Sequence, residues 1–578
     1  MRLTTRVFWI VGLVLPALVA MTVIVWAEEK VGPTTVTGVV RNADGPIAGA
    51  HVRVRATDNM ALSDANGVFK ISLADATQPV TLTAWAPGHF IGAVQGVATG
   101  EQPTITIQRH YTTDNLEYDW FEVEGAEGSA ACGLCHTGVG EWEADAHGQA
   151  GVNPRFLTMY AGTDVEGNQS AQTAMDYLGN MLPRDDSLPY YGPGFKLDYP
   201  NRAGNCASCH TPMASKIDNT TNCGWSGCHT SVTSEYSAQV PDGVSPLYLT
   251  GDAAEGIGCD FCHKIADVVL DEETMLPLPD MPGIMSLRLH RPSEGQDIFF
   301  GTLDDVPGKD VYLPLQAESA FCAACHHGVF GGVVGVGQVT GGTVIYNSYG
   351  EWLDSPYSDP ETGQTCQDCH MPISDAEYFV DPEAGGLLRE GQIHIHTMPG
   401  ASDEELLQNS AAMTATAFIS DGVLSVDVAV ANDKTGHHLP TGAPMREMLL
   451  VVEAVGDTGE PLPLVSGETL PEWTGDYAGD AGKAFEKLLQ DEWTGEMPTG
   501  AYWRPVSIVS DTRLPAKATD ETHYLFDAHG VESGAVDVRL IFRRTFQALA
   551  EQKGWNDPDI LMEQNVLEVR ADEAVGQD

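Results

Sequence analysis

The stretch NCASCHTPMASKIDNTTNCGWSGCHT (residues 205–230) holds four cysteines and two histidines, and their spacing limits how the central region can fold. Cys206, Cys209 and His210 form a C-x-x-C-H set. A longer C-x4-C-H set follows at Cys223, Cys228 and His229. Taken alone, the stretch is compatible with two covalent haem sites, one zinc site or a pair of disulfides.

The remaining cysteines distinguish these alternatives, because all twelve fall into six sets in which a histidine directly follows the second cysteine. The sets are Cys132/Cys135/His136, Cys206/Cys209/His210, Cys223/Cys228/His229, Cys259/Cys262/His263, Cys322/Cys325/His326 and Cys366/Cys369/His370. Neither disulfides nor zinc sites require a histidine after every pair. C-x-x-C-H is the attachment motif of c-type haem, in which both thiols bond to the haem edge and the histidine binds the iron. The sequence therefore predicts six haem c groups with these histidines as proximal ligands.

A low-spin haem needs a second axial ligand, either histidine or methionine. Six of the eighteen histidines are proximal, which leaves twelve. His51, His89, His110, His523 and His529 lie in or beside other predicted domains and are set aside. The predicted distal ligands are His147, His290, His327, His394, His396 and His437.

Three of these assignments depend on local spacing. His327 directly follows His326, and neighbouring side chains diverge, so we expect it to serve an adjacent haem. His394 and His396 have strand spacing, so both side chains should face one side. They could serve two adjacent irons, or one could bind iron while the other binds a haem propionate. Met213 and Met371 also follow haem motifs closely, but we expect them to pack rather than to bind iron.

Charge and the N-terminus restrict the class of protein. The chain of 578 residues has a formal net charge of −51, which excludes a nucleic-acid binder and favours basic partners. Arg2 and Arg6 precede an apolar run from Phe8 to Val25. Residues 1–27 are therefore predicted to be a cleaved signal peptide or a retained membrane anchor, and either one exports the rest of the chain.

The regions that flank the cysteines have the alternating pattern of strands. Residues 33–108 are predicted to form a β-sandwich, because apolar positions recur with a period of two in 50–56 and 69–73. Residues 412–570 are predicted to form a second β-rich domain, with one amphipathic helix at 543–555. Residues 130–400 between them show few periodic runs, which fits a core filled by cofactors. The Gly-rich segment 328–342 is predicted to be a loop.

Two motifs resemble known families. TVTGVVRNADGPIAGAHVRVRATDNMALSDANGVFKISL (35–73) is similar to the carboxypeptidase regulatory-like, transthyretin-like domain of exported proteins, which implies a spacer or docking module. GHHLPTG (436–442) and EWLDSPY with TCQDCHMP (351–372) resemble elements of exported multihaem cytochromes c. This resemblance implies that His437 is a ligand, that His438 supports it, and that Trp352 and Tyr357 pack near the last haem.

The expected fold is therefore multidomain, with a transthyretin- or Ig-like β-sandwich, an irregular haem-packed cytochrome domain with short helices, and a C-terminal β-rich domain. The expected function is electron transfer through six haems in anaerobic or extracellular respiration, rather than enzymatic catalysis. One alternative is a reductase of small nitrogen or sulfur species with one open haem, and another is a subunit of an extracellular filament. Expected partners are redox proteins, other cytochromes or further copies of the chain, in the periplasm, at a membrane or outside the cell.

Overall fold

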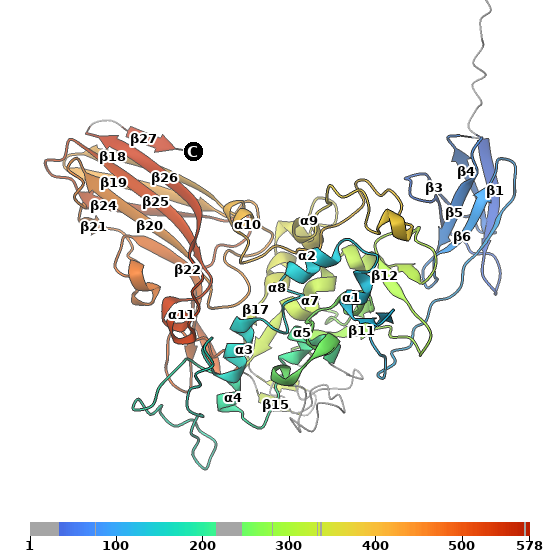
Figure 1. Ribbon diagram of the computed structural model, residues 1–578. Helices are drawn as coiled ribbons and strands as arrows, with labels where there is room; N and C mark the ends of the chain where they lie inside the picture. The colour runs from blue at the N-terminus through green and yellow to red at the C-terminus, as the bar shows by residue number, and fades with distance from the viewer. Residues whose placement is uncertain are drawn as a thin grey trace, which may run out of the picture.

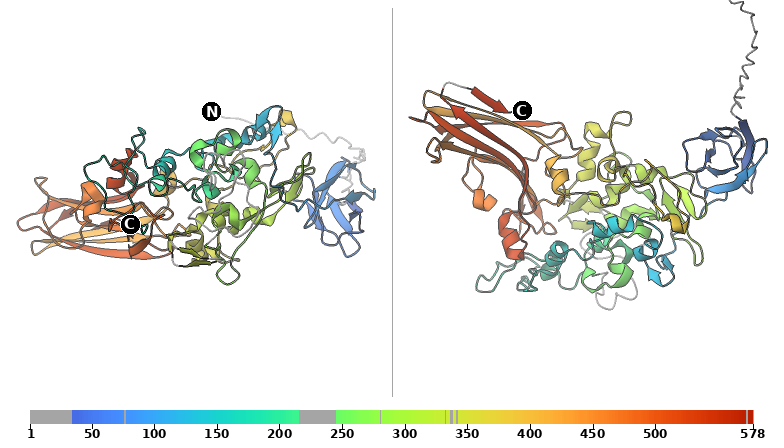
Figure 2. Two further views of the ribbon diagram at one scale, coloured as in Figure 1. Left: turned by 90° about the horizontal axis from the view of Figure 1, so that it is seen from below. Right: turned by 45° about the horizontal axis from the view of Figure 1, so that its top comes forward.

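The computed structural model describes residues 34–214, 245–571 and 574–577, apart from residues 76, 280, 332, 336, 337 and 341. Figure 1 shows three parts in a row, and we call them the N-terminal part (34–108), the central part (109–411) and the C-terminal part (412–577). The two β-rich parts lie at opposite ends, and the central part, with its short helices, lies between them. Two further views keep this order (Figure 2).

The N-terminal part consists of two sheets around one apolar core. Its strands are β1 (Thr34–Arg41), β2 (His51–Val54), β3 (Met60–Leu62), β4 (Val68–Leu73), β5 (Val80–Trp85), β6 (Gly92–Val97) and β7 (Thr104–Thr106). The sheet orders are β4-β1-β7 and β3-β2-β5-β6. In β4, Phe69, Ile71 and Leu73 are buried, whereas the residues between them are exposed. This alternation places one face of the strand on the core shared by the two sheets.

The central part contains many short elements. Its helices are α1 (Ser129–Cys132), α2 (Val139–Ala144), α3 (Pro154–Ala161), α4 (Phe195–Asp198), α5 (Ala207–His210), α6 (Cys259–Cys262), α7 (Ala320–His326), α8 (Ser348–Leu353), α9 (Cys366–His370) and α10 (Glu404–Gln408). Its strand pairs are β8 (Glu122–Val123) with β9 (Ala126–Glu127), β10 (Ile265–Val268) with β11 (Leu287–Leu289), and β12 (Phe299–Gly301) with β13 (Asp310–Tyr312). Helices this short are unstable alone, so packing must hold them in place.

The prediction of a loop over 328–342 is wrong. β14 (Gly328–Phe330) pairs with β17 (Thr343–Tyr346), and β15 (Val333–Gly335) pairs with β16 (Gln338–Thr340). The glycines suggested an irregular segment, but the valines between them are β-branched and favour extended backbone.

The C-terminal part also has two sheets. Its elements are β18 (Ala412–Ser420), β19 (Val423–Ala431), β20 (Glu447–Gly456), β21 (Leu464–Ser466), β22 (Gly482–Asp491), β23 (Val506–Asp511), β24 (Thr519–Asp527), β25 (Ser533–Arg543), α11 (Gln547–Lys553), β26 (Ile560–Arg570) and β27 (Ala574–Gln577). The sheet orders are β21-β24-β19-β18-β27 and β23-β22-β20-β25-β26. The helix predicted over 543–555 begins only at Gln547, because Arg543 pairs with Glu447 in the ladder between β20 and β25.

Buried polar contacts fix the C-terminal part to the central part. The fully buried Lys553 at the end of α11 donates from Nζ to the carbonyl oxygens of Thr158 (3.2 Å), Thr163 (3.0 Å) and Pro193 (2.6 Å). Arg504 donates to both carboxylate oxygens of Asp198 at the end of α4, at 2.8 and 3.0 Å. All donors of the Lys553 ammonium thus have acceptors, as a buried charge requires.

Two adjacent aspartates connect the N-terminal part to the central part. Arg53 of β2 donates to both oxygens of Asp304, at 2.6 and 3.1 Å. The backbone N–H of Ala56 donates to Asp305 at 2.6 Å, and Arg389 also donates to Asp305 at 2.7 Å. The bidentate geometry of Arg53 fixes both distance and orientation at this junction.

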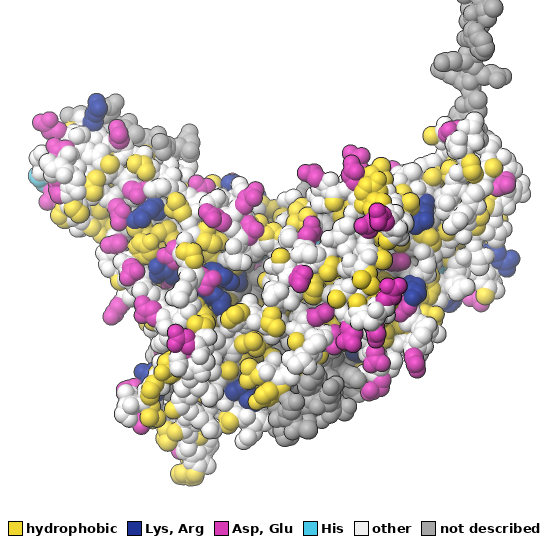
Figure 3. Space-filling model, in the orientation of Figure 1, with side chains coloured by type: hydrophobic (Ala, Val, Ile, Leu, Met, Phe, Trp, Pro, Cys, Tyr) yellow, Lys and Arg dark blue, Asp and Glu magenta, His cyan; other side chains and the backbone are white. Residues whose placement is uncertain are grey.

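In the part of the chain that the structure describes, no helix has the length and apolar character needed to cross a membrane. The predicted leader, residues 1–27, lies outside that part. Figure 3 shows acidic side chains spread over one face of the molecule and fewer basic ones, in keeping with the net charge of −51.

Candidate haem-binding site

Five of the six Cys-Cys-His sets lie on or directly beside short helices, namely α1, α5, α6, α7 and α9. The set Cys223/Cys228/His229 lies outside the described residues. In three sets the histidine N–H donates to the carbonyl of the first cysteine four residues earlier: His136 to Cys132 (2.9 Å), His210 to Cys206 (3.0 Å) and His263 to Cys259 (3.1 Å). This turn places positions i, i+3 and i+4 on one face, so both thiols and the imidazole face the same side.

Two pairs of motifs dock in the same way. The N–H of Cys259 donates to Oγ of Ser129, which lies three residues before Cys132, at 2.9 Å. The N–H of Cys366 donates to Oγ of Ser319, which lies three residues before Cys322, also at 2.9 Å. A serine thus connects α1 to α6 and α7 to α9 by the same contact.

Contacts between cysteines show that these motifs are neighbours. A hydrogen bond with Cys259, together with burial, raises the pKa of the Cys132 thiol. The pKa of Cys322 is raised in the same way beside Cys366, and that of Cys209 beside Cys325. None of the described cysteines is joined in a disulfide.

Two of the predicted haem-binding cysteines, Cys135 and Cys369, are exposed, whereas the other eight described cysteines are half-buried. Cys135 is fixed by its backbone. Its carbonyl oxygen accepts from the N–H of Asp381 at 2.8 Å, and the next residue, His136, forms a β-bridge with Val380.

The docking contacts of the first and the last motif use the first cysteines, Cys132 and Cys366, which meet Cys259 and Cys322. Cys135 and Cys369 stay in the predicted haem-binding set.

His326 faces His147, one of the predicted distal residues. Their ring centroids are 6.0 Å apart, with an angle of 51° between the ring planes. Nδ1 of His147 lies 2.7 Å from Oδ1 of Asp145, so this nitrogen carries the proton and Nε2 is left to bind a metal. Burial lowers the pKa of His326 to about 3, which keeps its imidazole neutral, as a metal ligand must be.

His370 faces His437 in a second arrangement of this kind. Their ring centroids are 6.3 Å apart, with an angle of 18° between the ring planes. Nδ1 of His370 lies 2.7 Å from the carbonyl oxygen of Pro399, and Nδ1 of His437 lies 3.0 Å from that of His438. In both rings Nε2 is therefore the nitrogen that could bind a metal. His437 belongs to the C-terminal part.

The two separations fit one metal ion between each pair of rings. A metal–imidazole bond is about 2 Å, and a ring nitrogen lies about 1 Å from its ring centre, so two axial imidazoles have centroids about 6 Å apart. The observed 6.0 and 6.3 Å match this value. His147, His326, His370 and His437 are therefore the residues that would hold an iron at these two places.

His394 and His396 do not face the same motif, although they have strand spacing. Nδ1 of His394 lies 2.6 Å from the carbonyl oxygen of Met371, next to the last motif. His396 stacks on Phe379 at 5.5 Å, and Phe379 in turn packs on His136 of the first motif at 4.8 Å. The structure thus places the two histidines beside different motifs.

His290 lies beside His110, a histidine that its sequence position excluded. Their ring centroids are 5.7 Å apart, with an angle of 44° between the planes. Both rings pack on Phe300, whose carbonyl oxygen lies 2.6 Å from Nδ1 of His263. His110 therefore belongs to the surroundings of the fourth motif. No spacing signal in the sequence connects it to that motif.

The proximal His210 is packed against an aromatic ring. Phe156 of α3 stacks on it with centroids 3.7 Å apart and an angle of 4° between the planes. Burial lowers the pKa of His210 to about 4, so its imidazole is neutral. Met213 nearby is buried in the same apolar cluster as Phe261. That placement fits the packing role expected for Met213.

The loop that carries His437 rests on the two aromatic residues that the cytochrome resemblance pointed to. A Cβ added to Gly436 would lie 3.1 Å from the Trp352 ring and 3.3 Å from Cβ of Tyr357. Nε1 of Trp352 donates to the carbonyl of Gln364 at 2.8 Å. His438 lies beside Glu351, with Nδ1 3.9 Å from the carboxylate. Trp352 and Tyr357 therefore support the backbone next to His437.

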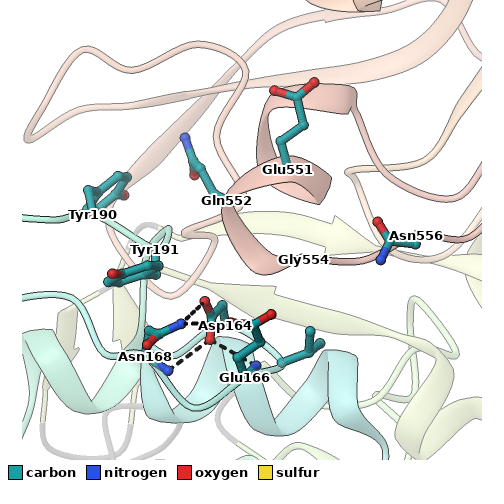
Figure 4. Close-up of a pocket in the computed structure, with 10 residues that line it drawn as sticks. Asp164, Glu166, Asn168, Tyr190, Tyr191, Glu551, Gln552, Gly554 and Asn556 are labelled. Atoms are coloured by element: carbon teal, nitrogen blue, oxygen red, sulfur yellow. Dashed lines mark hydrogen bonds between the residues drawn. The ribbon is translucent and has the colours of Figure 1, made fainter.

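A pocket of about 460 Å³ lies apart from the Cys-Cys-His sets, between the turn after α3 and helix α11. Figure 4 shows Asp164 and Asn168 on one side and Glu551 and Gln552 on the other. The residues that line it include neither cysteine nor histidine. It is therefore not part of the candidate haem site.

Comparisons with known proteins give weak likenesses only. No protein-family model and no curated protein matches the chain. Among solved structures, a penta-heme cytochrome c552 from Thermochromatium tepidum is 19% identical, with 76% of this chain and 97% of that chain covered and a TM-score of 0.47. A chain of a cohesin–X-dockerin complex from Acetivibrio cellulolyticus is 18% identical, covers 17% of this chain and 65% of its own, and has a TM-score of 0.12. Both scores are too low to establish a shared fold.

Proposed function

We propose that the chain carries six covalently bound haem c groups and conducts electrons between redox partners outside the cytoplasm. The observation that carries this proposal is the pair of facing histidines at each of two motifs, His147 with His326 and His370 with His437, at 6.0 and 6.3 Å. In each case the motif histidine meets a residue expected from the sequence to be a distal ligand. When bound, the haems supply reversible one-electron chemistry at iron.

The arrangement of the cysteines supports a conducting row rather than isolated centres. Hydrogen bonds connect the first motif to the fourth, and the fifth motif to both the second and the sixth, through Cys132–Cys259, Cys209–Cys325 and Cys322–Cys366. Cys262 of the fourth motif and Cys325 of the fifth pack against the same apolar cluster. Haems anchored at neighbouring thiols have adjacent edges. The protein then contributes the fixed spacing, the neutral axial imidazoles and the hydrogen bonds to their Nδ1 atoms.

The acidic surface supports partners with basic surfaces, because complementary charge speeds association. The positively charged start of the chain and its apolar run support export to the periplasm, a membrane surface or the cell exterior. We also propose that copies of the chain assemble with one another, which would extend the row of haems.

We expect the ferric protein to show low-spin signals and a reduction that spans several overlapping one-electron steps. At two of the sites a pair of histidines would hold the iron, which would leave no position there for a weak-field ligand. Electron paramagnetic resonance and a potentiometric titration followed in the haem absorption bands measure both properties. A dominant high-spin signal that responds to nitrite or sulfite would instead favour the reductase alternative.

A further inference from the structure

Helix α8 lies between two of the predicted distal histidines and contacts the surroundings of both. Asn347 precedes the helix as its N-cap residue, and its Oδ1 accepts a hydrogen bond from Nδ1 of His327 at 2.6 Å. Asparagine is among the best N-cap residues, yet this side chain makes no capping hydrogen bond to α8. Its amide oxygen instead accepts the hydrogen bond from the imidazole of His327.

A glycine makes room for this use of Asn347. A Cβ added to Gly350 would lie 2.3 Å from Oδ1 and 2.5 Å from Nδ2 of Asn347, which is closer than non-bonded atoms approach. The amide therefore lies over the first turn of the helix at a position that only glycine leaves open. His327 itself is buried, with 6% of its surface exposed.

Glu351, one turn further along α8, holds the loop that carries His437. Its side chain is 3% exposed. One carboxylate oxygen accepts from the hydroxyl of Thr441 at 2.5 Å and from the N–H of His438 at 3.3 Å. The other oxygen accepts from Arg513 at 2.6 Å. Glu351 thus connects α8 to His438 and Thr441, in the segment that directly follows His437.

We infer that α8 is a shared positioning element, in which Asn347 orients His327 and Glu351 fixes the loop of His437, so that one short helix sets the sixth ligands of two haems. This inference rests on the proposed function. Because His437 already faces His370, the iron served by His327 is a different one. Asn347 and Glu351 are positioning residues, since each acts through a histidine rather than on the iron.

The two residues should act on different properties. An acceptor on Nδ1–H makes an imidazole a stronger electron donor and so favours the ferric state. Asn347→Asp should therefore lower the potential of one haem, and Asn347→Leu should raise it. Gly350→Ala should also raise it, because the methyl group displaces the amide while alanine favours the helix itself.

A potentiometric titration of the holoprotein, resolved into its one-electron steps, measures this effect. We expect one step to move, in opposite directions for the Asp and Leu variants, while the others stay in place. Asn201→Leu is the matched control, because Asn201 is exposed and should change no step. Unchanged steps in all three variants, or equal shifts of every step, would overturn the role of Asn347.

Glu351 is tested by spin state. Glu351→Ala should release the His437 loop and convert part of one haem to high spin, and added imidazole should restore the low-spin signal. Glu351→Gln keeps one acceptor oxygen and should give a smaller high-spin fraction. Glu361→Gln removes the same charge from an exposed position and should give none. A Glu351→Ala protein with the full low-spin signal would show that Glu351 does not position His437.

These outcomes separate failure of this inference from failure of the proposed function. If the unaltered protein has no covalent haem, the proposed function fails. If it has six low-spin haems and the α8 variants match it in every step and spin state, only the positioning role fails.

Discussion

Replacing His437 with alanine is expected to convert one haem from low spin to high spin. His437 faces His370 with ring centroids 6.3 Å apart and nearly parallel planes, so its removal leaves the iron on His370 without a sixth ligand. The fold should persist, because the neighbouring backbone is held independently. Asn432 donates to the carbonyl oxygen of His437 at 2.8 Å, and Leu439 exchanges hydrogen bonds with Leu514.

Electron paramagnetic resonance of the ferric protein measures this change, with about one haem in six moving to the high-spin signal. Added imidazole should occupy the vacated position and reverse the change. His523→Ala is the control, because His523 is an exposed histidine of β24 that pairs with Asp427 and lies in none of these contacts. A His437→Ala protein with an unchanged spectrum would remove His437 from the ligand set.

Replacing Arg504 with methionine is expected to lower the free energy of unfolding by about 3–5 kcal/mol, the usual cost of leaving a buried charge unpaired. Arg504 donates to Asp198 at 2.8 and 3.0 Å and to Asp491 at 2.7 Å. The side chains of both aspartates are fully buried. The variant therefore leaves two carboxylates without their cation where the C-terminal part meets α4.

Denaturant unfolding of the holoprotein, followed in the haem bands and in tryptophan fluorescence, tests this loss. Arg184→Met breaks an exposed pair with Asp186 and should cost less than about 1 kcal/mol. Because Asp198 is on α4, we also expect the contact between the C-terminal part and the central part to be lost before the rest of the Arg504 variant unfolds. Equal stabilities for the Arg504 and Arg184 variants would show that this network does not hold the two parts together.

The sequence was most informative where chemistry fixes residue spacing. The thiols and imidazole of one haem must share a helical turn, so C-x-x-C-H can be recognised without knowing what lies around it. His147 and His437 could be proposed as ligands because each lies in a recognisable local context. The structure then places each of them opposite a motif histidine.

The same spacing says nothing of which motifs are neighbours in the fold. The N–H of Cys259 donates to Ser129 and that of Cys366 donates to Ser319, so α1 docks on α6 and α7 docks on α9.

Sequence reasoning also failed where contacts depend on the tertiary fold. His110 lies shortly after β7 and far from His290 in sequence. In the folded chain the centroids of their rings are 5.7 Å apart. Asn347 and Glu351 carry no motif, because their roles depend on which loops pack against α8. In residues 328–342 the glycine content favoured a loop, yet the valines between the glycines form strands. Strand pairing depends on the tertiary fold, which residue propensity alone does not show.

The most direct test of the account is the intact mass of the chain after export from a host that attaches haem c. We expect the mass of the polypeptide plus six haems, with no cysteine left to react with an alkylating reagent. A chain without added haem, or one whose cysteines are joined in disulfides or bind zinc, would contradict it.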